Sequence, residues 1–256
     1  MADAADPVRL DVALVERGLV ATRSRARDLI KRGVVRLGGS VVTKPGASVP
    51  PTSEIALDPD EPDSVSRGAL KLQAALDHFA LDATGRLALD IGASTGGFTE
   101  ALLRAGANHV VAVDIGTGQL HSRLRSDPRV TSLEQTDARA LVDTHLPSCP
   151  GAIVADVSFI SLTDALGAPL RLAAPGAWCV LLVKPQFELS RRDIGKGGIV
   201  RLPADQMRAL KRVKGWLTGL ETESGHPVWR ILGAIPSPIT GKKGNTEYLL
   251  AAVHVA

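Results

Sequence analysis

The stretch from Leu87 to Thr99 restricts the possible folds of this chain more than any other segment. It begins with the apolar run Leu87-Ala88-Leu89, passes through Asp90 into a glycine-rich turn at residues 92–97, and continues into a helical pattern from Phe98. An apolar run that ends in such a turn is typical of a buried parallel strand followed by a helix. The stretch therefore predicts a doubly wound, mostly parallel α/β sheet, in which ligands bind at the carboxyl ends of the strands.

Acidic residues follow three successive predicted strands at this edge: Asp90, Asp114 after residues 110–113, and Asp137 after residues 130–134. An acid in this position can hold ribose hydroxyls, which indicates a nucleoside-containing cofactor. Neither G-x-G-x-x-G nor a phosphate-binding P-loop is present, and three carboxylates would repel a pyrophosphate. S-adenosylmethionine has an amine, a sulfonium and ribose hydroxyls but no phosphate, so it fits best. The alternatives are a dehydrogenase, disfavoured by the glycine spacing, and acids that only cap the following helices.

A fourth acid and a lysine end two further predicted strands. Asp156 follows the apolar run at 152–155, and Lys184 ends the apolar run at 177–183. Burial favours the neutral form of a lysine, which can then act as a base, whereas a neighbouring carboxylate favours the charged form. The sequence leaves this protonation state open, and Lys184 could also extend from the sheet edge into water. We favour a functional role because both strands flank the cofactor crevice.

The front of the chain is basic. Between Arg17 and Lys44 there are eight basic residues and a single acid, Asp28. The pattern predicts a helix from Leu10, a second helix after Thr22 and short strands near residues 34–37, 40–42 and 54–57. Arg23, Arg27 and Lys31 recur every four residues and share one helical face. Such a face indicates a polyanion-binding surface, although a solvated charged helix is the simpler alternative.

A proline-punctuated acidic segment, residues 58–63, indicates a domain boundary. We therefore expect a small unit at 1–60, a linker at 61–65 and the cofactor-binding domain at 66–256. The hydrophobic fraction of 45% and the length of 256 residues allow one large and one small core. No apolar run approaches the length of a membrane span and no metal-ligand spacing is present, so we expect a cytoplasmic protein without a metal.

The first sixty residues resemble the S4 RNA-binding domain. The resemblance is carried by Arg9-Leu10-Asp11, by Ser24-Arg25-Ala26 and by Gly33-Val34-Val35 with the Gly38-Gly39 turn. Arginine and lysine on a rigid helix bind phosphates without reading bases, and structured RNA is then recognised largely by its shape. The candidate RNA-binding residues are Arg9, Arg23, Arg25, Arg27, Lys31, Arg32, Arg36, Lys44 and Arg67.

The remainder resembles FtsJ-type 2′-O-ribose methyltransferases, and the chain as a whole is similar to the TlyA family of ribosomal RNA methyltransferases, also known as haemolysin A. The motifs that carry this resemblance are Ser66-Arg67-Gly68-Ala69-Leu70-Lys71-Leu72, Asp90 to Thr99, Asp114-Ile115-Gly116, Ala155 to Ser161, Val183 to Glu188, Gly195-Lys196-Gly197-Gly198 and Gly244 to Tyr248.

This resemblance implies a class I methyltransferase sheet, S-adenosylmethionine as cofactor, and a catalytic set of Lys71, Asp156, Lys184 and Glu247. It also implies methylation of a cytidine 2′-hydroxyl in 16S ribosomal RNA, 23S ribosomal RNA or both, within ribosomal subunits. Lys184 is the residue expected to activate the hydroxyl, with Asp156 orienting it. The candidate cofactor-binding residues are Asp90, Gly92, Ser94, Thr95, Gly96, Gly97, Phe98, Asp114, Asp137 and Asp156.

Two other functions stay open at this point. One is a ribosome-binding or assembly factor that keeps the fold without catalysis. The other is a membrane-active haemolysin, for which no apolar span or strongly amphipathic surface helix is evident. The chain also departs from some relatives before Ser66: Pro62-Asp63-Ser64-Val65 lacks the arginine and tryptophan thought to couple the two domains. The resemblance therefore supports cofactor affinity and inter-domain coupling less firmly than it supports the catalytic set.

Overall fold

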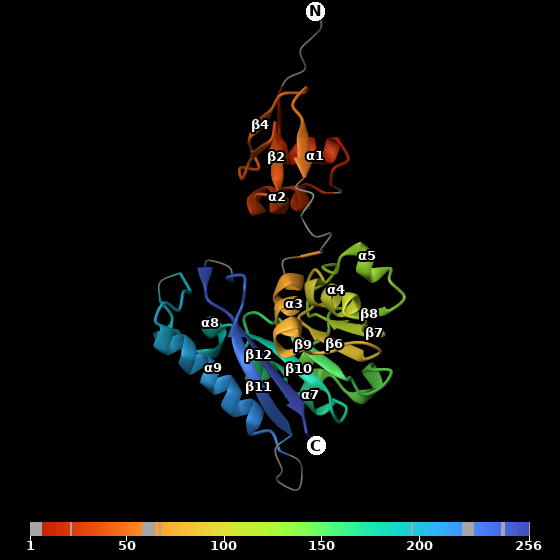
Figure 1. Ribbon diagram of the computed structural model, residues 1–256, viewed down its shortest axis with the longest axis vertical. Helices are drawn as coiled ribbons and strands as arrows, with labels where there is room; N and C mark the ends of the chain where they lie inside the picture. The colour runs from red at the N-terminus through yellow and green to blue at the C-terminus, as the bar shows by residue number, and fades with distance from the viewer. Residues whose placement is uncertain are drawn as a thin grey trace, which may run out of the picture. The chain divides into compact units, whose positions relative to one another are not determined.

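The computed structural model describes residues 7–20, 22–57, 65–66, 68–195, 197–221, 228–241 and 244–255. Contacts within the chain divide it into two compact units, Met1–Asp63 and Ser64–Ala256. Figure 1 labels the helices and strands of each unit.

The first unit combines a helix pair with two small antiparallel sheets. In the larger sheet β2 lies between β3 and β5, and in the smaller one β1 pairs with β4. Gly38 and Gly39 form the β2–β3 turn with φ of 56° and 80°, as a two-residue hairpin turn requires. The elements are β1 (Val8–Arg9), α1 (Leu10–Glu16), α2 (Arg23–Arg32), β2 (Val35–Leu37), β3 (Ser40–Val41), β4 (Ser48–Val49) and β5 (Ile55–Leu57).

A compact apolar core holds this unit together. It is built from one face of each helix and from the inward positions of the strands, because helical spacing of three and four residues places these side chains on one side. The predicted helices and hairpin are confirmed, whereas β1 and β4 are not anticipated by the sequence pattern. The buried residues are Leu10, Ala13, Leu14, Ala26, Leu29, Ile30, Val35 and Val49.

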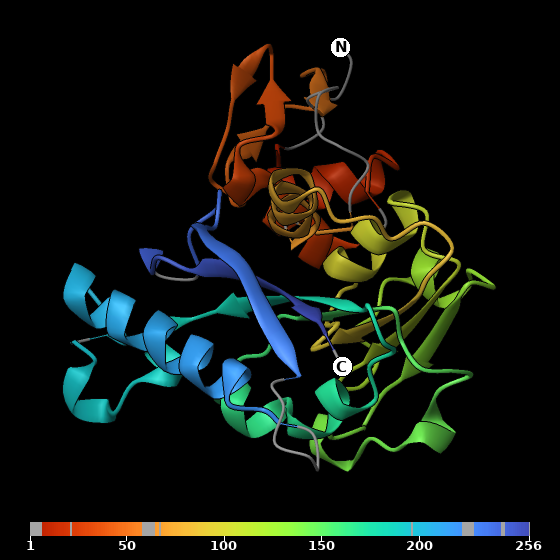
Figure 2. The same cartoon turned by 60° about the horizontal axis from the view of Figure 1, so that its bottom comes forward.

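The second unit is built on a seven-stranded sheet with the order β11-β12-β10-β9-β6-β7-β8. The pairs among β8, β7, β6, β9 and β10 are parallel, and β12 runs antiparallel to both β10 and β11. In Figure 2, β11 and β12 are the blue strands. The strands are β6 (Leu87–Ile91), β7 (His109–Val113), β8 (Val130–Leu133), β9 (Ala152–Ala155), β10 (Trp178–Val183), β11 (Trp229–Pro236) and β12 (Tyr248–His254).

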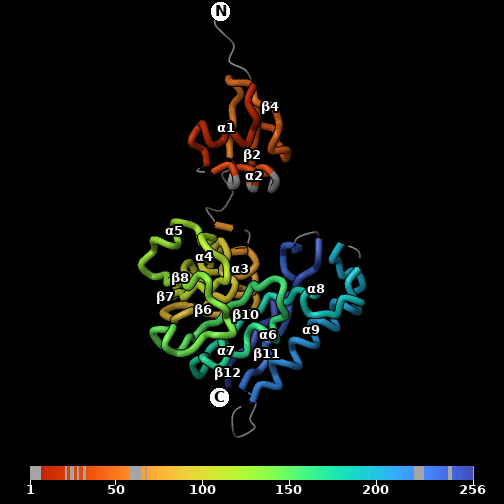
Figure 3. Tube along the Cα trace, turned by 180° about the vertical axis from the view of Figure 1, so that it is seen from behind, coloured from red at the N-terminus to blue at the C-terminus, as the bar shows by residue number. Residues whose placement is uncertain are grey.

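Helices cover both faces of this sheet, which explains why its central strands are apolar on both sides. On one face α3, α4 and α5 pack on Ala88 and Val110, and on the other α6, α7 and α9 pack on Leu89 and Ile153. Figures 1 and 3 show the unit from opposite sides. The helices are α3 (Gly68–Phe79), α4 (Gly97–Arg104), α5 (Ser122–Arg125), α6 (Leu162–Ala165), α7 (Gly167–Arg171), α8 (Pro185–Glu188) and α9 (Pro203–Thr218), with the short 3-10 helices η1 (Ala138–Ala140), η2 (Asp143–His145) and η3 (Arg191–Asp193).

The strand order reverses direction between β6 and β9. From β6 the chain proceeds outward through β7 to β8, and it then returns to place β9 on the other side of β6. Ligands of doubly wound sheets bind beyond the carboxyl ends of the strands at such a switch point. The predicted doubly wound α/β fold with a small α+β unit before it is confirmed, and its switch point lies at the glycine-rich turn after β6.

Candidate active site

The register of the sheet brings the predicted site residues to one edge. Ile91 in β6 pairs with Val113 in β7 and with Ala155 in β9, so the turns after these strands begin at the same level. In the antiparallel pair Val183 lies opposite Tyr248, which places the end of β10 beside the start of β12. Acids and lysines that are far apart in the sequence therefore lie along one edge.

The glycine-rich turn after β6 is tightly enclosed by its neighbours. Gly92 has φ 79°, and a Cβ there would lie 2.8 Å from the carbonyl oxygen of Asp156. Gly96, with φ 98°, forms the N-cap of α4 and leaves no room for a Cβ against Leu124. Ser94 also has a positive φ, 49°, which is uncommon outside glycine. The turn thus combines close backbone approach with conformations that only glycine adopts readily.

Asp90 presents a buried carboxylate beside this turn. Its Oδ2 accepts a hydrogen bond of 2.6 Å from Thr99 Oγ1, and its Oδ1 has no partner among the residues that the structure describes. Burial, with smaller contributions from the nearby charges of Asp156 and Asp114, raises the pKa of this carboxyl to about 7. A buried oxygen without a donor is rare and costly. An ammonium group would satisfy it, so the site fits the amino acid portion of S-adenosylmethionine.

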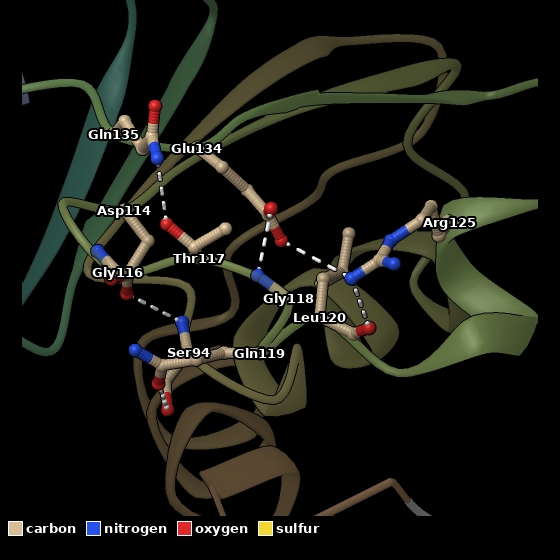
Figure 4. A network of polar contacts seen from close by, with 10 residues as sticks. All are labelled: Ser94, Asp114, Gly116, Thr117, Gly118, Gln119, Leu120, Arg125, Glu134 and Gln135. Carbon is tan, nitrogen blue, oxygen red and sulfur yellow. Dashed lines mark hydrogen bonds and ion pairs between the residues drawn. The ribbon is translucent and has the colours of Figure 1, made fainter.

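Asp114 ties the turn after β6 to the loop after β7, as Figure 4 shows. Its Oδ2 accepts from the Ser94 backbone N–H at 2.8 Å, and its Oδ1 accepts from the Gly116 N–H at 2.7 Å. Each carboxylate oxygen keeps a second lone pair for a ligand hydroxyl. Farther along the loop, Glu134 accepts from the Gly118 N–H at 2.8 Å and pairs with Arg125.

Asp137, the third predicted acid, is already engaged by the chain itself. It is the N-cap of η1, where it accepts from the Arg139 N–H and pairs with the Arg139 guanidinium. These hydrogen bonds lower the pKa of Asp137 to about 2. Its part in binding a cofactor stays a prediction, as do those of Thr95 and Phe98.

Two ion pairs contain the four predicted catalytic residues. Lys184 Nζ lies 2.6 Å from Asp156 Oδ1 and donates to Ser158 Oγ at 2.8 Å. Lys71 Nζ, which comes from α3, lies 2.6 Å from Glu247 Oε2 just before β12. Except for the partly exposed Asp156, these residues are buried. The amino groups of two lysines are therefore held at the same sheet edge as the buried carboxylate of Asp90.

Phe159 is a feature of this edge that the sequence reading missed. The side chain is 91% exposed, its φ is 68°, and its ring lies 5.3 Å from that of Phe187. A bulky residue with a positive φ is a strained outlier of the kind found at functional sites. An aromatic residue directly after the Asp156-Val157-Ser158 segment was the available signal in the sequence.

The end of the linker and the first residue of the domain contact the start of α4. The Val65 N–H donates to Glu100 Oε2 at 2.6 Å, and a Cβ on Gly97 would collide with Ser66 Oγ. Val65 and Ser66 are thus connected to the first turn of α4, which follows the glycine-rich turn. The other linker residues, 61–64, and Arg67 lie outside the described residues.

In the first unit, a buried acid gathers three of the predicted RNA-binding arginines. Asp11 in α1 is fully buried and accepts from Arg9 (2.9 Å), Arg23 (3.2 Å) and Arg27 (2.8 Å), whose side chains are about half exposed. Hydrogen bonds from Arg9 and the other two hold the pKa of Asp11 well below its usual range. The cluster carries a net positive charge and fixes the guanidinium groups in place.

Among the other predicted RNA-binding residues, the structure describes the side chains of Lys44 and Arg36. Lys44 is exposed, and Arg36 is half-buried and donates weakly to the Gly39 carbonyl at 3.4 Å. Arg25, Lys31 and Arg32 belong to α2, but their side chains lie outside the described part of the structure.

Comparison with known proteins supports the assignment that this architecture suggests. The FtsJ-like methyltransferase family model matches residues 64–254, and the S4 domain model matches residues 8–55. A sheet with this strand order, preceded in the sequence by an S4 domain, defines a class I RNA methyltransferase with its own RNA-binding module. The chain belongs to the TlyA family of RNA 2′-O-methyltransferases.

Individual relatives agree with this family. The chain is 44% identical to the 16S/23S rRNA (cytidine-2′-O)-methyltransferase TlyA of Mycobacterium tuberculosis over 94% of its length and 88% of the relative. It is 37% identical to Hemolysin A of Brachyspira hyodysenteriae over 94% of this chain and 98% of that one. A solved structure of a candidate hemolysin from Streptococcus thermophilus superposes with a TM-score of 0.76 at 37% identity, covering 98% of this chain and 90% of that one.

Within the described ranges, no helix has the length and apolar character needed to cross a membrane.

Proposed function

We propose that this protein transfers the methyl group of S-adenosylmethionine to the 2′-hydroxyl of a cytidine in ribosomal RNA. The observation that carries the proposal is the Lys184–Asp156 ion pair, which lies at the same edge as Asp90 and beside the Lys71–Glu247 pair. The name of the Mycobacterium tuberculosis relative supports the substrate. Ribosomes lie in the cytoplasm, so the protein would act there.

The cofactor would be held by the turns after β6 and β7. Asp90 Oδ1 would accept from the ammonium group, and Asp114 would accept from the ribose hydroxyls. Gly92 and Gly96 would allow the backbone to approach the ligand closely. Bound S-adenosylmethionine supplies an electrophilic methyl group, and a C–O bond to the ribose forms as the S–C bond breaks.

Lys184 would act on the attacking oxygen. A ribose hydroxyl is a weak nucleophile, so its proton must be accepted or polarised as the C–O bond forms. Lys184 Nζ, in its neutral form, would accept that proton and become an ammonium group, while Asp156 and Ser158 would fix its position. Lys71 and Glu247 would complete the hydrogen bonds around the hydroxyl. Because the displacement is in line, holding the oxygen in position supplies much of the rate.

Two kinds of contact would hold the RNA: contacts with its phosphates and stacking on one of its bases. The Arg9–Arg23–Arg27 cluster on Asp11 would bind phosphates, which gives affinity that depends on salt. The exposed ring of Phe159 offers a stacking surface for a base beside Lys184.

The test uses labelled S-adenosylmethionine with purified protein and unmodified small and large ribosomal subunits. We expect label at a ribose 2′-oxygen of a cytidine, lost in Lys184→Ala and retained in Lys211→Ala, a control at an exposed lysine of α9. Mapping the label decides between the subunits. Cofactor binding without transfer to either subunit would contradict the proposal and favour a non-catalytic ribosome-binding factor.

A further inference from the structure

Glu188 is a buried carboxylate close to the catalytic pair that the proposed reaction does not use. It is the last residue of α8, the single helical turn that begins directly after Lys184, and its side chain is 2% exposed. Burial raises the pKa of this carboxyl. A buried acid is costly unless its hydrogen bonds are well made, so its partners show what it does.

Both oxygens of Glu188 bond to the segment that follows β9. Oε2 accepts from Ser161 Oγ at 2.6 Å, and Oε1 accepts from the Leu162 N–H at 2.8 Å. The carbonyl oxygen of Glu188 in turn accepts from Arg212 of α9 at 2.8 Å, which anchors α8 from the other side. Glu188 thus forms a fixed bridge between the segment after β10 and the segment after β9. Figure 3 labels the helices involved, α6, α8 and α9.

The loop held by this bridge consists of residues 157–161 and carries two groups that face Lys184 and Phe187. Ser158 Oγ accepts from Lys184 Nζ at 2.8 Å, and Phe159 packs its ring against Phe187 while keeping a strained, positive φ. At its start the loop is fixed by the bond from the Asp156 N–H to the Ile91 carbonyl, 2.9 Å. At its end the loop is fixed by the hydrogen bond from Ser161 Oγ to Glu188 Oε2. A strained conformation persists only where the surroundings determine it.

We propose that Glu188 is a positioning residue for methyl transfer. It holds the 157–161 loop by its far end, so that Ser158 stays bonded to Lys184 Nζ and Phe159 keeps its exposed position. The role rests on the proposed function, because it concerns the geometry of the same lysine. Glu188 itself does not touch the reacting atoms; it acts through Ser161 and Leu162. A displacement of the lysine by a fraction of the reacting distance is enough to lower the rate strongly.

The experiment measures single-turnover methylation by the full-length protein at saturating RNA and cofactor, together with cofactor affinity. In Glu188→Ala we expect the rate per folded molecule to fall about 10- to 100-fold, while the cofactor Kd changes less than about twofold. Glu188→Gln keeps an acceptor for the Leu162 N–H and should recover most of the rate. Ser161→Ala removes one of the two bonds to the Glu188 carboxylate, together with the contacts of the Ser161 hydroxyl with Thr163, but keeps the Leu162 N–H bond to Glu188, so it should give a smaller loss in the same direction. The matched control is Leu217→Ala, a buried truncation in the last turn of α9.

Amide hydrogen exchange supplies a readout that does not depend on the RNA substrate. Glu188→Ala should speed exchange at residues 157–162 and leave the other amides near their wild-type rates, whereas Leu217→Ala should not affect this loop. A rate that falls only in proportion to the folded fraction, or glutamine as inactive as alanine, would overturn the inference. If the wild-type protein methylates neither subunit, the proposed function fails, and the role of Glu188 in methyl transfer fails with it. Hydrogen exchange then tests the bridge alone: local acceleration in Glu188→Ala would support the contact that holds the loop, and unchanged exchange would overturn it as well.

Discussion

Replacing Asp90 with asparagine should stabilise the protein and weaken cofactor binding at the same time. The carboxyl is fully buried, one oxygen accepts from Thr99, and the other has no partner in the described part of the chain. Asparagine keeps the size of the side chain and an acceptor for Thr99, but it carries no charge. The substitution therefore separates the cost of burying the charge from the benefit that the charge gives to a cationic ligand.

The magnitude follows from the pKa of Asp90, which burial raises from 3.8 to about 7. An acid whose pKa is higher in the folded state takes up protons on folding, so its contribution to stability falls as the pH rises through this interval. This difference in pKa lowers the free energy of unfolding by about 4 kcal/mol above pH 7. Roughly 1.5 kcal/mol of that loss is already present at pH 5. Relative to Asp90→Asn, the wild-type free energy of unfolding should fall by about 3 kcal/mol between pH 5 and pH 8.

Urea denaturation of both proteins at pH 5 and pH 8, without cofactor, measures this difference. Asp77→Asn, at an exposed acid of α3, is the matched control and should show almost no change with pH. Calorimetric titration with S-adenosylmethionine should show an affinity lower by about 10- to 100-fold in Asp90→Asn, the usual value of a hydrogen bond to a charged group. A stability difference independent of pH would refute the burial argument, and an unchanged affinity would refute the assignment of the cofactor's ammonium to Asp90.

Three further substitutions test other parts of the structure. Gly92→Ala should lower stability by about 1–3 kcal/mol in thermal unfolding and weaken cofactor binding, because its Cβ would meet a carbonyl oxygen 2.8 Å away. The control Gly118→Ala, at a glycine with positive φ but open space around it, should lower stability less. Asp11→Asn should lower the stability of the first unit by about 1–3 kcal/mol at pH 7. This effect should shrink in acid, because the pKa of Asp11 is depressed in the folded protein. Filter binding should show weaker affinity for RNA. Lys71→Met leaves Glu247 buried without its partner, so methyl transfer should fall while Lys71→Arg retains part of it.

The fold and the edge of the site could be predicted because they depend on local patterns. Apolar runs that end in acids identified the strands, and the glycine-rich turn after Leu89 located the switch point of the sheet. Asp90 and Asp114 lie where a parallel strand must deliver its last side chains, so their position follows from strand type alone. Pairing of Lys184 with Asp156 was predicted for the same reason, since both end neighbouring strands.

The features that were missed depend on contacts between distant segments. The sequence shows arginines on one face of α2, but not that Asp11, buried in another helix, gathers two of them with Arg9. The exposure of Phe159 depends on how its loop is held after β9. Glu188 looks like an ordinary helical acid until the structure places Ser161, 27 residues earlier, against its carboxylate.

The antiparallel strand β12 explains how the fourth predicted catalytic residue reaches the edge. In a fully parallel sheet, the residue before a strand lies at the amino edge, opposite the ligand site. Because β12 runs the other way, with Tyr248 opposite Val183, the residue before it lies beside the end of β10. Glu247 therefore meets Lys71, which is 176 positions away in sequence, at the edge where Lys184 emerges. Reversal of this one strand thus adds a carboxylate and, through it, a second lysine to a site that the parallel strands alone would leave with one pair.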